Sequence, residues 1–151
     1  MRPAINIGLS VSRVGSAAQN PLMKEFVGSL KLELAQYREV EIFASFGSEI
    51  DITTQQTIIR GARLVELLKQ VPYQPMSLDH QLVLLFAGRN GYLDQLTLDQ
   101  VEEFKEYITD WFGDVEATMA LENVLDLEDE ITRDLVLDML MREVAALMQT
   151  A

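Results

Sequence analysis

Hydrophobic residues alternate with small or polar ones at the start of the chain, over residues 4–12. Ile5, Ile7, Leu9 and Val11 occupy every second position of this segment. A period of two residues predicts a β-strand with one buried face. A single strand leaves its edge N–H and C=O groups unpaired. We therefore expect the strand to join a sheet that lies outside this segment.

A helical period replaces the alternation after Pro21, which is a favoured first residue of a helix. The pattern predicts a helix from Leu22 to about residue 46, ended by Gly47, and a second helix from the capping residue Asp51 through Lys69. Two prolines within 71–75 end the second helix. The expected apolar faces comprise Leu22, Phe26, Leu30, Leu34 and Tyr37 in the first helix, and Ile52, Ile59, Leu64 and Leu67 in the second.

Helical signals continue to the end of the sequence. Ser77 opens a short apolar helix that ends near Gly88, and Thr97 with Gln100 has the spacing of a capping box for a helix to about Gly113. Region 114–150 consists almost entirely of helix-forming residues, with a break near 125–129. The expected packing face of the last helix is Ile131, Leu135, Met139, Leu140, Val144 and Leu147. The chain is thus predicted to be mainly α, an antiparallel helical bundle preceded by one strand.

Charge divides the chain unevenly. Its 151 residues carry a net charge of −12, and segment 71–151 holds seventeen acidic but only four basic residues. Such a segment repels phosphate backbones, so nucleic-acid binding through it is not expected. Its acidic surface is either a solvated face or the docking face for a basic protein. No apolar run is long enough to span a membrane, since LVLLFAG at 82–88 is far shorter than the roughly 20 residues required.

Few residues could perform chemistry unaided. The chain has no cysteine and one histidine, His80, which excludes disulfides, thiolate metal sites and cysteine nucleophiles. The motifs GxxxxGK[ST], GxSxG and HExxH are absent. The acidic run 127–130 lacks the spacing of a calcium loop. His80, in the first turn of a predicted helix, is expected to be an ordinary surface or half-buried side chain.

Arg13 directly follows the predicted strand, in an expected loop of small residues that leaves its side chain free to project. Its planar guanidinium suits bidentate contact with phosphate. The alternative is an ion pair with a nearby carboxylate, and spacing alone favours that alternative.

Four blocks of sequence carry a resemblance to a known family. They are RPAINIGLSVSRVGSAAQ at 2–19, GSLKLELAQYREVEIFASFGSEID at 28–51, TQQTIIRGARLVELLKQ at 54–70 and AGRNGYLDQL at 87–96. Together they resemble the alpha subunits of F-type, rotary ATP synthases. The similarity is close over 2–96 and weaker from there to 151, and it covers only the C-terminal part of such a protein.

The resemblance implies how the chain is organised. Residues 1–19 would be the final strand and arginine loop of the nucleotide-binding domain, whose parallel sheet is carried on another chain. Residues 20–151 would be the C-terminal helical domain. The N-terminal barrel and the phosphate loop have no counterpart here, so we expect either one piece of a split subunit or a shortened one. Blocks such as GARLVELLKQ are most similar to mitochondrial and proteobacterial members.

Roles for individual residues follow from the same resemblance. The alpha subunit is not catalytic itself, but Arg13, in VSRVG, matches the arginine that it contributes in trans to the catalytic site on the beta subunit. It also holds ATP or ADP with Mg²⁺ without turning it over, mainly through its N-terminal part, so we expect this chain alone to bind none. Arg2, Pro3 and Gln70 match residues around the adenine. Pro72 stands where the family usually has a glutamine, which departs from the pattern.

The resemblance also implies which partners and which compartment to expect. The partners are the N-terminal part of the alpha subunit, the beta subunits, the gamma subunit of the central rotor and an added lineage-specific subunit on the acidic C-terminal region. No nucleic acid and no membrane insertion are expected. The compartment is the matrix side of the mitochondrial inner membrane, with a bacterial or plastid membrane as the alternative. The competing function is an acidic helical adaptor or assembly protein derived from this subunit, without an energy-coupling role.

Overall fold

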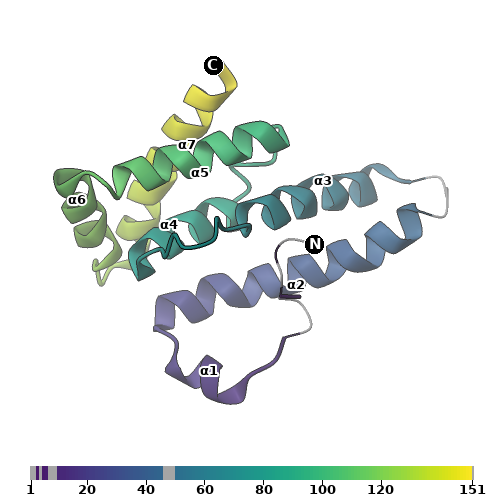
Figure 1. The fold of residues 1–151 in the computed structure, drawn as a ribbon, viewed down its shortest axis with the longest axis horizontal. Helices are drawn as coiled ribbons and strands as arrows, with labels where there is room; N and C mark the ends of the chain where they lie inside the picture. Colours follow the sequence, from purple (N-terminus) through teal and green to yellow (C-terminus); the bar gives the residue numbers. More distant parts are fainter. Residues whose placement is uncertain (1–2, 4, 7–9, 46–49, 151) are drawn as a thin grey trace.

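Helices make up the regular secondary structure of the described residues. The computed structural model describes residues 3, 5–6, 10–45 and 50–150. Within these residues there are seven helices and no strand, so the prediction of a mainly helical chain is confirmed (Figure 1). The helices are α1 Arg13–Ala18, α2 Pro21–Ala44, α3 Ile52–Leu67, α4 Leu78–Arg89, α5 Leu98–Trp111, α6 Val115–Leu125 and α7 Glu130–Thr150.

The predicted strand is not formed by the residues that can be described. Residues 5–6 and 10–12 have no strand geometry, and the other residues of 4–12 lie outside the described part of the chain. A strand in the sheet of another chain would require that sheet as its partner. The expectation for an assembled sheet therefore stays a prediction.

The predicted arginine loop is wrong in its local structure, because Arg13 is the first residue of α1. The side chain of Ser12 accepts a hydrogen bond from the amide of Gly15, which caps the helix (3.0 Å).

Capping side chains begin most of the predicted helices where the sequence places them. Asp51 accepts a hydrogen bond from the amide of Thr54 (2.9 Å), and Ser77 accepts one from the amide of His80 (3.2 Å). Thr97 and Gln100 form a complete capping box, in which each side chain bonds the backbone N–H of the other residue. The predicted break near 125–129 falls between α6 and α7. The first residue of each of these helices follows from the local sequence, because the capping side chain accepts a hydrogen bond from an amide that has no partner within the helix.

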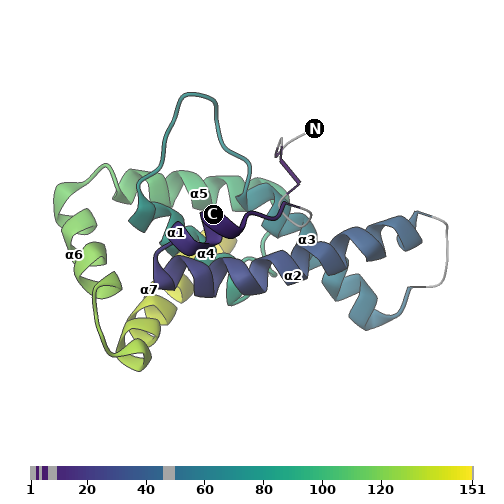
Figure 2. The same ribbon diagram turned by 90° about the horizontal axis from the view of Figure 1, so that it is seen from below.

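The two longest N-terminal helices form an antiparallel pair on which the rest of the bundle is built. α2 packs against α3 and α4, α3 packs against α5, and α5 packs against α7. Figures 1 and 2 both show α2 and α3 side by side, with the end of α2 and the start of α3 at one end of the molecule. α6 contacts α4 and α7 at the opposite end.

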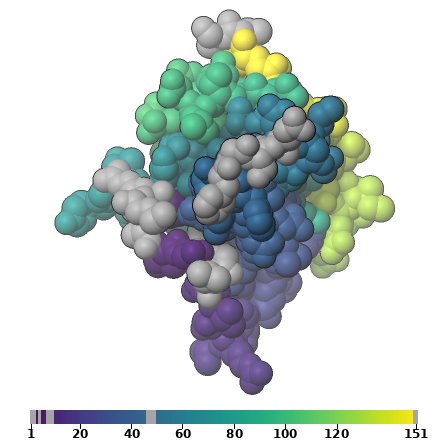
Figure 3. Space-filling view, turned by 90° about the vertical axis from the view of Figure 1, so that its right-hand side faces the viewer, coloured from purple at the N-terminus to yellow at the C-terminus, as the bar shows by residue number. Residues whose placement is uncertain are grey.

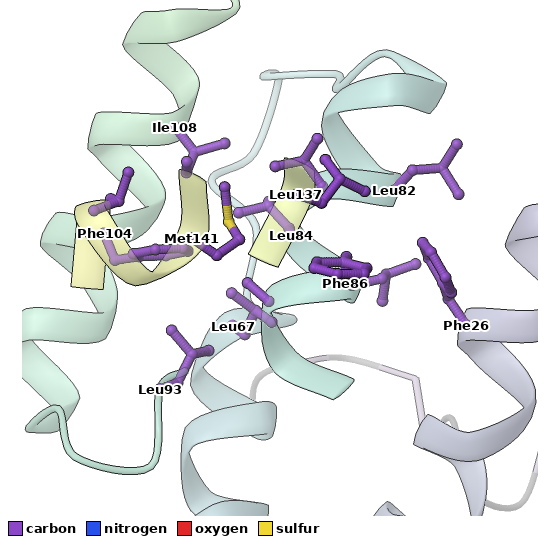
Figure 4. Packing of buried hydrophobic residues seen from close by; sticks show 14 of the residues in the cluster. Phe26, Leu67, Leu82, Leu84, Phe86, Leu93, Phe104, Ile108, Leu137 and Met141 are labelled. Carbon is purple, nitrogen blue, oxygen red and sulfur yellow. The ribbon is translucent and has the colours of Figure 1, made fainter. Parts of the chain in front are cut away.

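α4 is the central helix of the core. Every residue from Leu82 to Gly88 is buried, which explains why this segment has no polar face. The ring of Phe86 meets that of Phe26 from α2, with centroids 5.7 Å apart. Figure 4 shows α5 and α7 contributing Phe104, Ile108, Leu137 and Met141 to the same cluster.

The prediction for the packing face of α7 is wrong for most of its residues. Ile131, Leu135 and Met139 are exposed, as is Leu147, whereas Val144 is buried as expected and Leu140 is partly buried against the core. The residues that face the core are Arg133, Leu137, Met141, Val144, Ala145 and Met148. The helix carries two apolar stripes, and periodicity alone could not decide which one packs. Ile52 of α3 is also exposed rather than packed.

His80 is buried, contrary to the expectation of a surface or half-buried residue. Its ring stacks on Phe112 with centroids 4.7 Å apart, and its Nε2 lies 3.4 Å from the hydroxyl of Thr109. Burial lowers the pKa of His80 below its ordinary value of 6.5, because the charged imidazolium loses its hydration.

This pKa gives the folded state a dependence on pH. The imidazole of His80 binds a proton more readily in the unfolded chain than in the folded one. The buried, neutral His80 therefore contributes fully to the free energy of unfolding above about pH 6.5, and this contribution is lost as the pH falls below that value. We expect His80→Gln to reduce the loss of unfolding free energy between pH 7.5 and 5, measured by urea denaturation. Equal losses in the two proteins over that range would contradict this assignment.

Candidate functional site

Helix α1 presents the predicted functional arginine at the edge of the helical body. All of its residues are exposed, and Figure 3 shows the purple N-terminal residues projecting from the rest of the molecule. The Nζ of Lys31 in α2 donates a hydrogen bond to the backbone oxygen of Ser10, just before α1 (3.3 Å). A Cβ added at Gly15 would lie 3.0 Å from the Ser12 hydroxyl oxygen, so this turn favours a residue without a side chain.

The guanidinium of Arg13 is available for an external partner. It forms no ion pair or side-chain hydrogen bond within the described part of the chain. The nearby carboxylate that spacing alone favoured is therefore not found among these residues. An exposed, permanently charged and planar group of this kind can bind two phosphate oxygens at once.

Gln70 lies on the wall of a large cavity with a volume of about 720 Å³. One wall is the connection between α1 and α2, with Ala18, Gln19 and Asn20, and the opposite wall contains the end of α3 and part of α4. The structure thus brings Gln70 and the end of the arginine helix to one cavity. Arg13 itself does not line it.

Pro3 lies on a separate and much smaller hollow beside Leu34, Arg38 and Leu68. Leu68 also lines the large cavity, so the two hollows share a wall. Arg2, the other residue expected near the adenine, lies outside the described residues.

The lining of the large cavity decides what it could hold. Its polar side chains are the amides of Gln19, Asn20, Gln70 and Gln81, and the other lining residues are apolar, including Met76, Leu84 and Leu85. Amides can hydrogen-bond the edge of a nucleotide base. No charged side chain lines this cavity, so among its residues nothing could neutralise a triphosphate. The residues present fit a base but not its phosphates or Mg²⁺.

The segment after Gln70 turns away from the cavity. Pro72 and Tyr73 are exposed, and Tyr73 has a left-handed backbone conformation (φ 66°), which is uncommon for a residue other than glycine. Figure 2 shows this loop extending from the helical body. The side-chain amide of Gln70 lies 3.7 Å from the sulfur of Met76, where the chain returns. Pro72 supplies no side-chain donor, so Gln70 has no second glutamine two positions after it, in contrast to the pattern that the resemblance implies.

Comparison with known proteins identifies the family of the chain. Residues 19–142 match the sequence model of the family described as ATP synthase alpha/beta chain, C terminal domain. The chain belongs to this family. Over 106 residues it is 58% identical to the ATP synthase subunit alpha of Aquifex aeolicus (strain VF5), an alignment that covers 70% of this chain and 21% of that relative. The resemblance inferred from the four sequence blocks is therefore confirmed as one to the C-terminal region of an alpha subunit, and the aligned region spans about a fifth of the relative's length.

The family assignment accounts for the helical bundle, whose helices α2 to α6 lie entirely within residues 19–142. Arg13 and Pro3 precede the matched region, so their roles rest on the local sequence around them. Over the described ranges, no helix is long and apolar enough to cross a membrane. Those ranges also contain no cluster of three or more acidic or histidine side chains placed to hold a metal ion.

Sequence reasoning on this ATP synthase alpha/beta C-terminal domain missed several side chains of the cavity. Met23 and Leu30 of α2, Leu84 of α4 and Met76 of the preceding loop line it beside Gln70. Each of these helical residues lies on an apolar stripe, and such a stripe does not reveal where packing leaves a space. The end of α1 was missed as a cavity wall because the sequence predicted a loop there.

Proposed function

We propose that this chain serves as the C-terminal domain of an ATP synthase alpha subunit in the catalytic head of a rotary, proton-driven ATP synthase. The observation that carries the proposal is the 58% identity to an ATP synthase subunit alpha. The domain would have no catalytic activity of its own. Its role would be to complete an alpha subunit that binds nucleotide without hydrolysing it.

Arg13 is proposed to act in trans on the catalytic site of a neighbouring beta subunit. Its exposure on the projecting α1 and the absence of an ion-pair partner in the described residues support this role. Phosphoryl transfer concentrates negative charge on the equatorial oxygens of the transferred group, and an arginine can stabilise that charge from across an interface.

Gln70 is proposed to contact the adenine of the non-catalytic nucleotide, together with Arg2 and Pro3. The amide-lined cavity beside Gln70 supports recognition of a base. Its lack of charged lining residues fits the view that phosphates and Mg²⁺ are held by the nucleotide-binding domain. When bound, the nucleotide would tie this chain to that domain.

The proposed partners are the nucleotide-binding part of the alpha subunit, the beta subunits and the gamma subunit, with an added lineage-specific subunit on the acidic region. The complex would sit peripherally on a membrane. The matrix side of the mitochondrial inner membrane is the proposed location, with a bacterial or plastid membrane as the alternative.

Purification of the complex through a tag on this chain tests the proposal. After gentle membrane solubilisation, we expect the chain to co-purify with the beta subunit in equal amounts and with a polypeptide that carries the phosphate loop and barrel. The preparation should hydrolyse ATP. Recovery of the chain without any nucleotide-binding subunit would favour the adaptor function, in which the same sequence has no energy-coupling role.

A further inference from the structure

Helix α7 exposes a row of large apolar side chains to solvent. Ile131, Leu135 and Met139 are 80%, 59% and 64% exposed. Residues four positions apart lie on one face of a helix, so the three form a continuous stripe, called here the outer stripe. Isolated exposed apolar residues are ordinary, but a row of three on one helix face is typical of an interaction surface.

The outer stripe is distinct from the packing face of the same helix. Leu137, Met141 and Val144 face the core and are almost completely buried. α7 is therefore held in place by its inner face, which leaves the outer stripe unused within the described residues (Figure 4 shows Leu137 and Met141 in the core).

Acidic residues outnumber basic ones in the segment that carries the outer stripe. Segment 126–143 contains seven acidic and two basic residues. Both basic residues are already paired: Arg133 with Asp134 (2.9 Å) and Arg142 with Asp138 (2.9 Å). Asp138 also accepts a hydrogen bond from the hydroxyl of Tyr92.

Three carboxylates near the outer stripe have no such partner. Glu143 continues the row four residues after Met139. Glu128 and Glu130 lie at the N-terminal end of α7, where both line a hollow with Arg133 on the side of the helix that carries Leu137. None of the three forms an ion pair with a residue that the structure describes. The outer stripe thus has an uncompensated carboxylate at its C-terminal end, and two more lie at the N-terminal end of the same helix.

We propose that the outer stripe is the docking site for a basic amphipathic helix of another protein. Apolar side chains of that helix would cover Ile131, Leu135 and Met139. Flanking lysine or arginine residues would reach Glu143 at one end of the stripe, and Glu128 and Glu130 at the N-terminal end of α7. A second copy of this chain is a poor occupant, because it would bring a second acidic segment against the first. An anionic membrane surface is repelled for the same reason. The proposal does not depend on the role of Arg13.

A synthetic helical peptide provides the probe. We would titrate the full chain with an 18-residue peptide that has leucine on one helical face and lysine on the other, and follow binding by calorimetry. Two control peptides replace every lysine by glutamate or scramble the order so that no apolar face forms. The lysine peptide should bind, the other two at least about tenfold more weakly.

Variants of the chain locate the binding. The triple variant Ile131→Ser, Leu135→Ser, Met139→Ser should weaken binding at least about tenfold, since it removes the apolar contacts. Its matched control is Leu32→Ser with Ile42→Ser on α2, whose side chains are 68% and 59% exposed. That control should leave the affinity within about twofold, because it replaces exposed apolar side chains on a different helix.

A variant without three of the negative charges tests the electrostatic part of the binding independently. Glu128→Gln, Glu130→Gln, Glu143→Gln should weaken binding roughly threefold or more in about 50 mM salt and remove most of its salt dependence. Circular dichroism should show unchanged helicity in all variants, since the substituted side chains are exposed. The proposal is overturned if the outer-stripe variant binds like the wild-type chain, if the glutamate peptide binds as well as the lysine peptide, or if anionic vesicles bind through this stripe.

Discussion

Replacement of Arg13 by lysine is expected to lower ATP turnover of the assembled complex by several orders of magnitude, within the range of about 10³–10⁵ that an arginine supplied in trans can contribute. Lysine keeps the charge but presents it as a point, so it cannot span two phosphate oxygens as the planar guanidinium does. Arg13→Ala should do at least as much damage. Nucleotide binding should change less than turnover, as expected for a group that acts mainly in the transition state.

Arg38→Lys is the matched control for this experiment. The guanidinium of Arg38 is also partly exposed, but it pairs with Glu41 within α2 (3.0 Å). Its replacement should leave turnover per assembled complex unchanged. Multisite ATPase activity is measured for each variant and normalised to the amount of intact complex. If Arg13 were only structural, its variants would assemble poorly, but each assembled complex would hydrolyse ATP at the normal rate. Near-wild-type ATP turnover in an assembled Arg13→Ala complex would therefore contradict the proposed role of Arg13.

Helix boundaries were predictable because local chemistry determines them. Asp51, Ser77 and Thr97 cap helices where the sequence placed them, and the prolines at 72 and 75 lie in the segment between α3 and α4. A capping side chain acts on amides two or three residues away, so its effect can be read without knowledge of the rest of the fold.

The packing face of α7 was not predictable from its own sequence. Both Ile131–Leu135–Met139 and Leu137–Met141–Val144 follow a helical period, and only the neighbouring helices decide which row is buried. α5 packs against α7 and covers the second row. The error had a consequence for function, since the row assigned to the core is the one available to a partner.

The sequence proposes residues for the candidate site but does not reveal the shape of the cavity. The sequence around Arg13 and Gln70 identified both residues through a resemblance, and the structure adds an exposed guanidinium and an amide-lined cavity. That cavity arises where the α1–α2 connection, the end of α3 and α4 fail to fill the space between them. Such a space depends on tertiary packing, which no local pattern encodes.

The contact between α2 and α3 depends on one glycine, and we expect Gly61→Ala to destabilise the chain by about 3 kcal/mol. A Cβ on Gly61 would lie 2.2 Å from the Tyr37 ring atoms Cγ and Cδ2 and 2.4 Å from the Tyr37 Cβ. The Tyr37 side chain is buried, so its ring has little space to rotate away, and the Tyr37 Cβ is fixed to the backbone of α2. The two helices would therefore have to separate, at the expense of buried contacts on both.

Gly28→Ala is the matched control, because an added Cβ there meets nothing within 4 Å. It lies in the interior of α2, where alanine is favoured over glycine, so we expect a gain of roughly 0.5–1 kcal/mol. Unfolding in urea measures both changes. Tyr37→Ala then completes a double-mutant cycle. It removes the two ring atoms closest to the new methyl group but keeps the Cβ, so Gly61→Ala should cost at least about 1 kcal/mol less in that background and still destabilise the chain. A cost that is the same with and without the tyrosine side chain would show that the close approach of Gly61 to Tyr37 does not set the distance between α2 and α3.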